Sequence, residues 1–329
     1  MTKERVLSGI QPSGYLHLGN LVGALQNFVR LQDRYDCYYF VADWHALTTN
    51  YTTPSKIKEF TNDVVLNFLA CGLDPEKCTI FIQSRILQHA ELHVLLSMIT
   101  PLGWLERVPT YKEKQEEIKD KDLDTYGFLG YPVLQSADIM IYRAKYVPVG
   151  VDQVPHLEIT REICRRFNFL YDTSVLVEPE ALLTEFPKVV GTDGRKMSKS
   201  YNNCIYLNDP PDVVEGKLKT MMTDPARKRR SDRGTPELSP VYQLHLIFSS
   251  KEEQDFCAEG CRTASIGCLD CKKILIKNIF RVLEPIWQKR KEFISNPSRL
   301  KDIVMQGTEK AKVAAEETMQ LVRDAMASK

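Results

Sequence analysis

A short basic segment, GTDGRKMSKSYNN (191–203), contains two glycines followed by a run of lysine and serine residues. Lys196 and Lys199 alternate with Ser198 and Ser200, and no apolar period anchors the segment in a core. One interpretation is a solvated surface loop. The other is a flexible, glycine-hinged loop that binds an anion, because lysine side chains can stabilise negative charge as it develops and then release the anion.

A second candidate site lies near the N-terminus, in GIQPSGYLHLGN (9–20). His17 and Asn20 can each donate a hydrogen bond to a phosphate oxygen. Gly14 and Gly19 are small enough to let a nucleotide approach the backbone, and the helix expected next presents its N-terminus to an anion. The segment therefore favours binding of a phosphate group.

Alternating strands and helices are expected to position these segments. The apolar pattern predicts strands at 5–10, 37–43, 78–84 and 145–150, and helices at about 18–29, 54–71 and 153–167. This alternation is typical of an α/β fold with a doubly wound parallel sheet, a Rossmann-like nucleotide-binding domain whose ligands lie beyond the carboxyl ends of the strands. From Asp209 onward only helical periods are found, so a smaller all-helical domain is expected there.

The chain is therefore expected to have three parts. These are a Rossmann-like catalytic domain at 1–201 with a charged insertion near 111–124, a helical domain at 202–293, and a C-terminal helical tail at 294–329 that packs back on the catalytic domain. A further segment, HVLLSMITPLGWLERV (93–108), is too apolar for an exposed surface. It is interpreted either as a dimer interface or as an ordinary core helix.

Composition narrows the possible partners and compartments. The formal net charge of the 329 residues is +1, so nucleic acid must be met by a local basic patch such as RKRRSDR (227–233), unless that run is only a solvated helix end. The N-terminus does not resemble a signal peptide and no segment approaches membrane-span length, which predicts a cytoplasmic protein. Nine cysteines favour reduced thiols or a metal site over a disulfide framework.

Four motifs in order resemble those of class I aminoacyl-tRNA synthetases, and specifically the bacterial tryptophanyl-tRNA synthetases. Residues 17–20, His-Leu-Gly-Asn, resemble the first class signature, and 196–200, Lys-Met-Ser-Lys-Ser, match the second letter for letter. YPVLQSADI (131–139) and VPVGVDQ (147–153) follow in the order and spacing of the family, so the resemblance covers essentially the whole chain. Asn20 stands where the general class pattern has histidine, and tryptophanyl enzymes resemble this chain there.

The resemblance implies activation of L-tryptophan by ATP with Mg²⁺ and transfer to tRNA(Trp), with release of AMP and pyrophosphate. It also implies a homodimer, an anticodon-binding role for the helical domain, and no membrane or DNA partner. The catalytic set would be His17, Asn20, Lys196, Ser198 and Lys199. The ATP-binding set would be Gln11, Ser13, Gly19, Asn20, Lys112, Lys114, Gly150, Asp152, Gln153, Lys196, Met197, Ser198, Lys199 and Ser200. Lys112 and Lys114 lie in a charged run, where a solvated face is an equal interpretation.

The choice of amino acid is expected to depend on a pocket with one polar partner for the side chain. The resemblance implies a tryptophan pocket of Leu7, His45, Tyr131, Gln135, Asp138, Val147, Val149 and Gln153. Asp138 can accept an indole N–H, with Gln135 as a helper that orients the indole. Gln135 departs from the methionine of many bacterial members, and a glutamine with an aspartate also suits a phenol, so a tyrosyl-tRNA synthetase stays open.

Two other functions compete with a synthetase. One is a small-molecule adenylyltransferase that uses the His17 loop, and the other is a synthetase-like RNA-binding or regulatory protein without catalysis. The intact lysine segment argues against both, because without cleavage of ATP nothing would keep its lysines arranged for pyrophosphate.

The cysteines near the C-terminal end of the helical domain are a candidate metal site. Cys261, Cys268 and Cys271 follow the spacing Cys-x6-Cys-x2-Cys. The resemblance associates such a triplet with a [4Fe–4S] cluster whose fourth cysteine would lie near Leu238, where this chain has none; Cys257 is the substitute. The interpretations are a [4Fe–4S] cluster or zinc on these four cysteines, or small buried side chains that pack helices.

Overall fold

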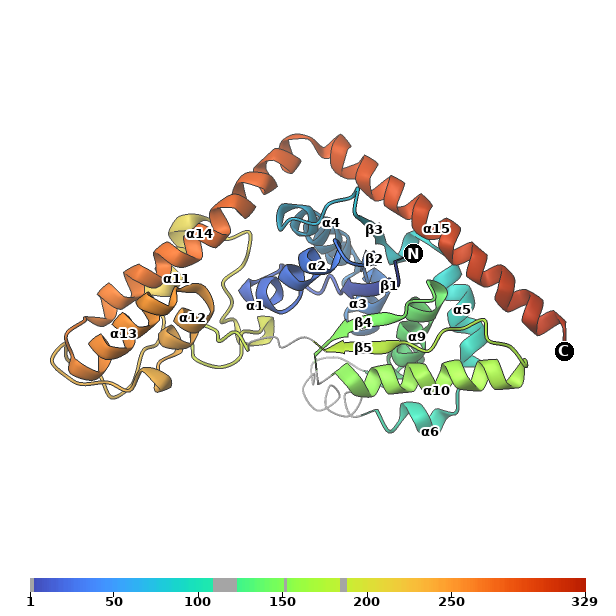
Figure 1. Cartoon of the computed structure of the whole chain (residues 1–329), viewed down its shortest axis with the longest axis horizontal. Helices are drawn as coiled ribbons and strands as arrows, with labels where there is room; N and C mark the ends of the chain where they lie inside the picture. Colours follow the sequence, from blue (N-terminus) through green and yellow to red (C-terminus); the bar gives the residue numbers. More distant parts are fainter. Residues whose placement is uncertain (1–2, 109–122, 151–152, 184–187) are drawn as a thin grey trace. The chain divides into compact units, whose positions relative to one another are not determined.

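The computed structural model describes residues 3–108, 123–150, 153–183 and 188–329 (Figure 1). The chain divides into two compact units, one of residues 1–13, 28–185 and 296–329 and the other of residues 14–27 and 186–295. This division differs from the predicted domains 1–201 and 202–293, because the loop that carries His17 and the lysine segment both belong to the second unit. The tail from 296 belongs to the first unit.

The first unit contains a five-stranded sheet in the order β3-β2-β1-β4-β5, and each neighbouring pair is parallel. The strands are β1 (Arg5–Ile10), β2 (Asp36–Val41), β3 (Cys78–Ile82), β4 (Tyr146–Val149) and β5 (Glu180–Leu183). In the central strand, Val6 pairs with Cys37 on one side and Tyr146 on the other. The predicted α/β class with a parallel sheet is confirmed. The edge strand β5 was not predicted, because its sequence EALL has no β-branched residue and its side chains are half-buried or exposed.

Helices and short helical turns surround this sheet (Figure 1). They are α3 (Asp43–Asn50), α4 (Pro54–Ala70), η2 (Gln83–Arg85), α5 (Gln88–Ser97), α6 (Leu102–Leu105), α8 (Tyr126–Leu129), α9 (Tyr131–Ile141), α10 (Val154–Leu170) and α15 (Pro297–Ala327). Several begin with proline in the first turn, where its missing N–H costs nothing. Helix α4 stops before Gly72, whose φ of +110° suits glycine, as the sequence predicts.

The C-terminal helix α15 packs against strand β3 and helix α5 of the first unit. A Cβ at Gly307 would collide with the backbone oxygen of Ile80, so glycine allows the helix to lie directly on the strand. Helix α15 has 31 residues and lies within the helical tail predicted at 294–329.

The second unit is helical in the described residues from 209 to 295, as predicted. Its elements are α1 (Leu18–Asn20), the π-helical turn η1 (Leu21–Leu25), η4 (Lys199–Tyr201), α11 (Pro211–Thr220), η5 (Pro236–Leu238), α12 (Pro240–Phe248), α13 (Lys251–Thr263) and α14 (Cys268–Ser295). The short helix α2 (Gln26–Leu31) crosses from this unit to the first. Ser250 and Glu253 form a capping box that starts α13. Within the described ranges, no helix has the length and apolarity needed to cross a membrane.

Candidate functional site

The two signature segments are brought together inside the second unit. His17 forms an isolated antiparallel bridge with Tyr206. On either side of it, the Leu18 N–H donates to Ile205 O at 3.0 Å and the Leu207 N–H donates to Leu16 O at 2.8 Å. The residues that follow the lysine segment therefore hold the backbone of the His17 loop in place.

Lys199 makes a direct contact between the two segments. Its Nζ donates to the backbone oxygen of Gly14 at 3.0 Å. Gly14 has a φ of +146°, and a Cβ there would lie 3.0 Å from Lys199 Cδ. Glycine is therefore required at position 14 both for its backbone conformation and for the close approach of the lysine side chain.

His17 is a buried, neutral imidazole with an unused ring nitrogen. Burial, together with the positive charge of Lys199, lowers the pKa of His17 to about 4. Its Nδ1 is buried and has no hydrogen-bond partner among the described residues. The Asn20 side-chain oxygen accepts the backbone N–H of His17 at 3.1 Å, which leaves the amide nitrogen of Asn20 as a donor. A Cβ at Gly19 would lie 2.9 Å from the His17 ring. This loop can offer polar groups to an anion.

Hydrogen bonds hold the backbone of the lysine segment in place more firmly than its composition suggests. Asn203 accepts the Ser198 N–H at 2.8 Å and donates to Asp193 at 2.7 Å and to the backbone oxygen of Lys196 at 3.2 Å. A Cβ at Gly191 would collide with the Asn203 side chain. The sequence suggested a loose hinge because these hydrogen bonds come from a single side chain, that of Asn203. Such contacts leave no periodic pattern in the sequence.

Within this frame the side chains of the segment point to different surroundings. Met197 is buried, Lys196 and Ser200 are exposed, and the Ser198 and Ser200 hydroxyls lie 2.9 Å apart. The remaining predicted ATP ligands belong to the first unit. Gln11 and Ser13 are exposed just after β1, and Gly150 is half-buried just after β4. Lys112, Lys114 and Asp152 lie outside the described residues.

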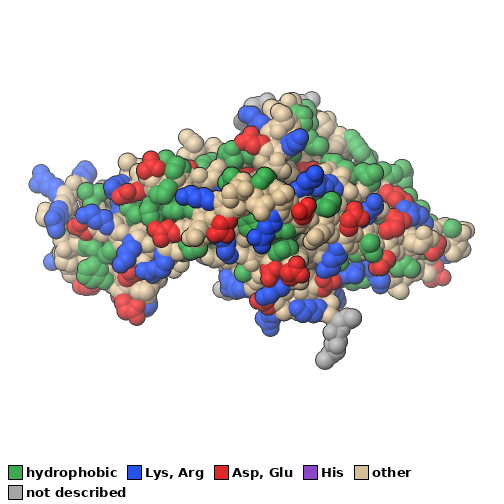
Figure 2. All heavy atoms as spheres, turned by 90° about the horizontal axis from the view of Figure 1, so that it is seen from above, with side chains coloured by type: hydrophobic (Ala, Val, Ile, Leu, Met, Phe, Trp, Pro, Cys, Tyr) green, Lys and Arg blue, Asp and Glu red, His purple; other side chains and the backbone are tan. Residues whose placement is uncertain are grey.

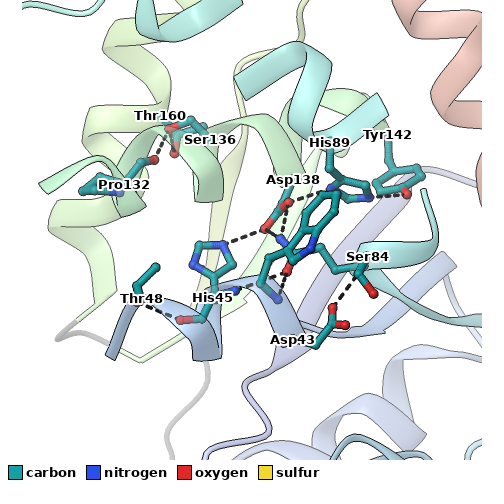
Figure 3. Close-up of polar contacts among 12 residues, drawn as sticks. Asp43, His45, Thr48, Ser84, His89, Pro132, Ser136, Asp138, Tyr142 and Thr160 are labelled. Carbon is teal, nitrogen blue, oxygen red and sulfur yellow. Dashed lines mark hydrogen bonds and ion pairs between the residues drawn. The ribbon is translucent and has the colours of Figure 1, made fainter. Parts of the chain in front are cut away.

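Asp138, on α9 in the first unit, is a buried carboxylate held by three side chains (Figure 3). His45 Nε2 donates to Oδ2 at 2.8 Å, and His89 Nδ1 donates to Oδ1 at 2.6 Å. Gln83 Nε2 donates to both oxygens, at 2.8 and 2.9 Å. The four acceptor positions of this carboxylate are therefore met by donors from the protein itself.

This network determines the charge of Asp138. Burial raises its pKa, but the hydrogen bonds from His45 and His89 outweigh burial, and the pKa is lowered to about 2. Because His89 directs its Nδ1 proton at Asp138, its Nε2 accepts the hydroxyl of Tyr142 at 2.7 Å. Asp138 is thus a fixed negative charge at neutral pH.

Gln83 and His89 were not predicted as site residues. Gln83 follows β3 directly, and its Oε1 accepts the Trp44 N–H at 3.1 Å just after β2. The rule that functional groups gather at the carboxyl ends of parallel strands could have identified Gln83. His89 lies inside α5 and carries no such signal.

The other predicted tryptophan residues fall into two groups. Leu7, Val147 and Val149 are buried in one apolar core cluster of the first unit. Tyr131 and Gln153 are joined through His156, since the Tyr131 hydroxyl lies 2.9 Å from His156 Nε2 and Gln153 Oε1 lies 2.9 Å from His156 Nδ1. Gln135 is half-buried on α9. His156 was not predicted; it orients two of the predicted side chains.

The predicted four-cysteine set is divided by the structure. Cys257, Cys261, Cys268 and Cys271 line the same small cavity, but the compact ligand group consists of His245, Cys257 and Cys271. Cys261 packs instead over Gly234, where a Cβ would lie 2.7 Å from its sulfur. Leu238, near which the resemblance places a further thiolate, is 63% exposed. The [4Fe–4S] cluster implied by the resemblance would therefore lack its fourth thiolate at this position.

The basic run 227–233 forms a turn of the second unit. Arg227 is used structurally, because its guanidinium donates to the backbone oxygens of Arg230 and Ile266 at 3.0 Å each. The exposed cations of the run are Lys228, Arg229, Arg230 and Arg233. Figure 2 shows Lys and Arg side chains gathered at the left end of the view, among those of the helical unit.

Comparisons with known proteins agree with these motifs. A model of the family described as tRNA synthetases class I (W and Y) matches residues 2–284. The chain is 57% identical to tryptophan-tRNA ligase of Thermotoga maritima, with 98% of each chain covered. It is 44% identical to tryptophan-tRNA ligase of Ralstonia nicotianae, with 99% of each covered.

Solved structures show the same similarity in three dimensions. The tryptophanyl-tRNA synthetase of Campylobacter jejuni, complexed with ADP and tryptophan, superposes with a TM-score of 0.89 at 32% identity. The match covers 98% of this chain and 99% of that one.

Proposed function

Because this chain belongs to the class I tRNA synthetases for tryptophan and tyrosine, we propose that it activates L-tryptophan with ATP and transfers it to tRNA(Trp). The products are tryptophanyl-tRNA, AMP and pyrophosphate. The observation that carries this function is the 57% identity to a tryptophan-tRNA ligase over 98% of both chains. That similarity also favours tryptophan over tyrosine, the main alternative left by the sequence.

Activation is an in-line attack of the tryptophan carboxylate on the α-phosphorus of ATP, and pyrophosphate leaves with increased negative charge. No covalent bond to the protein is needed, so its part is positioning and charge stabilisation. In this proposal Lys199, supported by Lys196, stabilises the departing pyrophosphate. Neutral His17 and the Asn20 amide donate hydrogen bonds to phosphate oxygens.

ATP is a substrate of this reaction, and Mg²⁺ would neutralise part of the phosphate charge when bound. The described residues suited to the nucleotide are the polar groups of the His17 loop and the lysine segment, with Gln11, Ser13, Gly150 and Gln153. No step of aminoacylation is assigned to the cysteine cluster.

Asp138 is proposed to accept the indole N–H of tryptophan. Since its acceptor positions are filled by protein donors, the indole must replace one of them. Gln83 is the donor that the indole can most easily displace. Its Nε2 donates to both Asp138 oxygens, so it can keep one hydrogen bond while it loses the other. His45 and His89 would then continue to hold the carboxylate in place.

The proposed tRNA contact is the basic turn at 227–233 in the helical unit, which we assign to the anticodon side of the tRNA. Its exposed cations would bind phosphates without reading bases. Since charged tRNA is consumed by translation, the proposed location is the cytoplasm.

Amino-acid-dependent exchange of labelled pyrophosphate into ATP tests the proposed function. Exchange is expected with tryptophan and ATP, and at least about 100-fold less with tyrosine at equal concentration, because a buried partner left unpaired gives strong discrimination. A preference for tyrosine would replace the substrate assignment, and no exchange with any amino acid would remove the enzyme assignment.

We also propose that the chain forms a homodimer whose interface includes residues 93–108. Met98 and Leu102 are 76% and 63% exposed, and the nearby Leu87 is 70% exposed. Large exposed apolar side chains that lie close in sequence are typical of an interface. Multi-angle light scattering at micromolar concentration is expected to give twice the chain mass of 37.8 kDa.

Charge substitution provides the control for the dimer. Met98→Glu is expected to halve the measured mass, while Leu246→Glu, at another exposed apolar position on α12, is expected to leave it unchanged. A monomeric wild type, or a dimer that both variants retain, would contradict this interface.

A further inference from the structure

Three helices of the second unit converge on a group of metal-ligand side chains that no step of the proposed function uses. His245 lies on α12, Cys257 on α13 and Cys271 near the start of α14. One ligand atom from each lies within 4.8 Å of the other two. His245 and Cys257 are fully buried, and Cys271 is half-buried. Side chains from separate helices therefore present one nitrogen and two sulfurs to a common point.

The separation between the His245 nitrogen and the Cys271 sulfur is close to that of a tetrahedral zinc site. With Zn–S of about 2.3 Å and Zn–N of about 2.0 Å, tetrahedral geometry places nitrogen and sulfur about 3.5 Å apart and two sulfurs about 3.8 Å apart. The observed distance from His245 Nε2 to Cys271 Sγ is 3.3 Å. A shift of a few tenths of an ångström would bring these atoms to ligand spacing.

The second ring nitrogen of His245 already has a partner of the kind found behind zinc-binding histidines. His245 Nδ1 lies 2.7 Å from the Ser249 hydroxyl, which in turn accepts a hydrogen bond from Asn278 Nδ2 at 2.9 Å. A partner at Nδ1 fixes the ring orientation and directs Nε2 toward the sulfurs. The Nε2 atom also lies 3.2 Å from the Cys271 backbone oxygen, a contact that zinc would replace.

We propose that His245, Cys257 and Cys271 bind one Zn²⁺ ion, and that Cys268, which lies outside this compact group, turns its thiolate toward the ion as the fourth ligand. Cys268 lines the same cavity and precedes Cys271 by three residues, a spacing that lets two thiolates share one ion. Imidazole and thiolate together favour zinc among the abundant divalent metals. The cavity measures about 20 Å³, which is room for a single ion or water molecule. This ligand set differs from a four-cysteine cluster because it includes His245 and leaves out Cys261.

The site is structural in this assignment. It joins α12, α13 and α14, while the catalytic contacts described above involve other residues. Closed sites of four protein ligands stabilise small helical regions without taking part in chemistry. Zinc would therefore raise the thermal stability of the second unit and leave the chemistry of pyrophosphate exchange unchanged.

Metal analysis of the full-length protein, purified without chelator and with a cleavable tag removed, tests the proposal. About one zinc and no iron per chain are expected. His245→Gln and Cys257→Ser are expected to lower the zinc content to less than about one tenth of that value. Cys261→Ser is the matched control and should keep the full zinc content, whereas a four-cysteine cluster would lose its metal in that variant.

Cobalt provides a readout that does not depend on whether a variant folds. Chelator-treated wild-type protein titrated with Co²⁺ is expected to show sulfur-to-cobalt charge-transfer absorption and tetrahedral bands that saturate at about one equivalent and disappear on addition of zinc. Wild-type protein without zinc and without this cobalt spectrum would overturn the proposal. Four iron atoms per chain with visible cluster absorption, or equal zinc loss in Cys261→Ser, would also overturn it.

Discussion

Replacement of Lys199 by alanine is expected to slow tryptophanyl-adenylate formation about 100- to 1000-fold, which corresponds to roughly 3 to 4 kcal/mol of lost transition-state stabilisation. The side chain reaches the first signature loop at Gly14, where negative charge on departing pyrophosphate would develop in the proposed mechanism. An interaction made mainly in the transition state changes the rate constant more than ground-state binding. The KM for ATP is therefore expected to change by less than about threefold.

Rapid-quench measurement of a single turnover separates these two effects. Lys251→Ala is the matched control, because Lys251 is an exposed lysine of the same unit that pairs only with Asp255 on α13 among the described contacts. It should leave adenylate formation unchanged. If Lys199→Ala formed adenylate at the wild-type rate, the lysine segment would not act on the departing charge.

The sheet could be predicted from sequence wherever burial leaves a continuous apolar run. Strands at 5–10, 37–43, 78–84 and 145–150 were expected within three residues of their observed ends. The edge strand β5 was missed because EALL lacks both alternation and β-branching. The division of the chain into units was also different, since it depends on non-local contacts such as the bridge between His17 and Tyr206, which have no sequence period.

The candidate site was predictable to the extent that its motifs are contiguous. His17, Asn20 and the lysines stand in two short segments, and the structure brings these segments together. Partners that complete a site from other elements were missed, as His89 shows for Asp138 and His245 shows for Cys271. A histidine in a helix looks the same in sequence whether it packs, orients a carboxylate or binds a metal.

Asp138→Ala is expected to reduce kcat/KM for tryptophan at least about 100-fold in pyrophosphate exchange, with little gain for tyrosine. The loss has two causes. The indole N–H would lack its acceptor, and the donors of His45, Gln83 and His89 would lose the buried carboxylate that they share. Tyrosine should gain little because the shape of the pocket does not change.

The matched control is Ser136→Ala, two residues earlier on α9. The Ser136 hydroxyl contacts Pro132 O and Thr160 at 2.8 and 2.9 Å and is not part of the Asp138 network (Figure 3). This variant should keep the wild-type kcat/KM. It therefore separates loss of the carboxylate from general damage to the helix.

Asp138→Asn distinguishes an acceptor role from a purely structural one if the alanine variant does not fold. The amide keeps the volume of the side chain and one acceptor oxygen, but its NH₂ group faces donors that now have no acceptor. Tryptophan activation should fall in this variant while the KM for ATP remains within about threefold of wild type, because the proposed nucleotide contacts involve other side chains. Equal losses for tryptophan and ATP would instead mean that Asp138 only supports the fold, and wild-type activity in a folded Asp138→Asn variant would show that the indole is recognised elsewhere.

The low pKa of Asp138 predicts how tryptophan binding depends on pH. Since the pKa of Asp138 is lowered to about 2, the wild-type carboxylate should stay ionised across the range from pH 5 to 8, where no step in tryptophan affinity should arise from its titration.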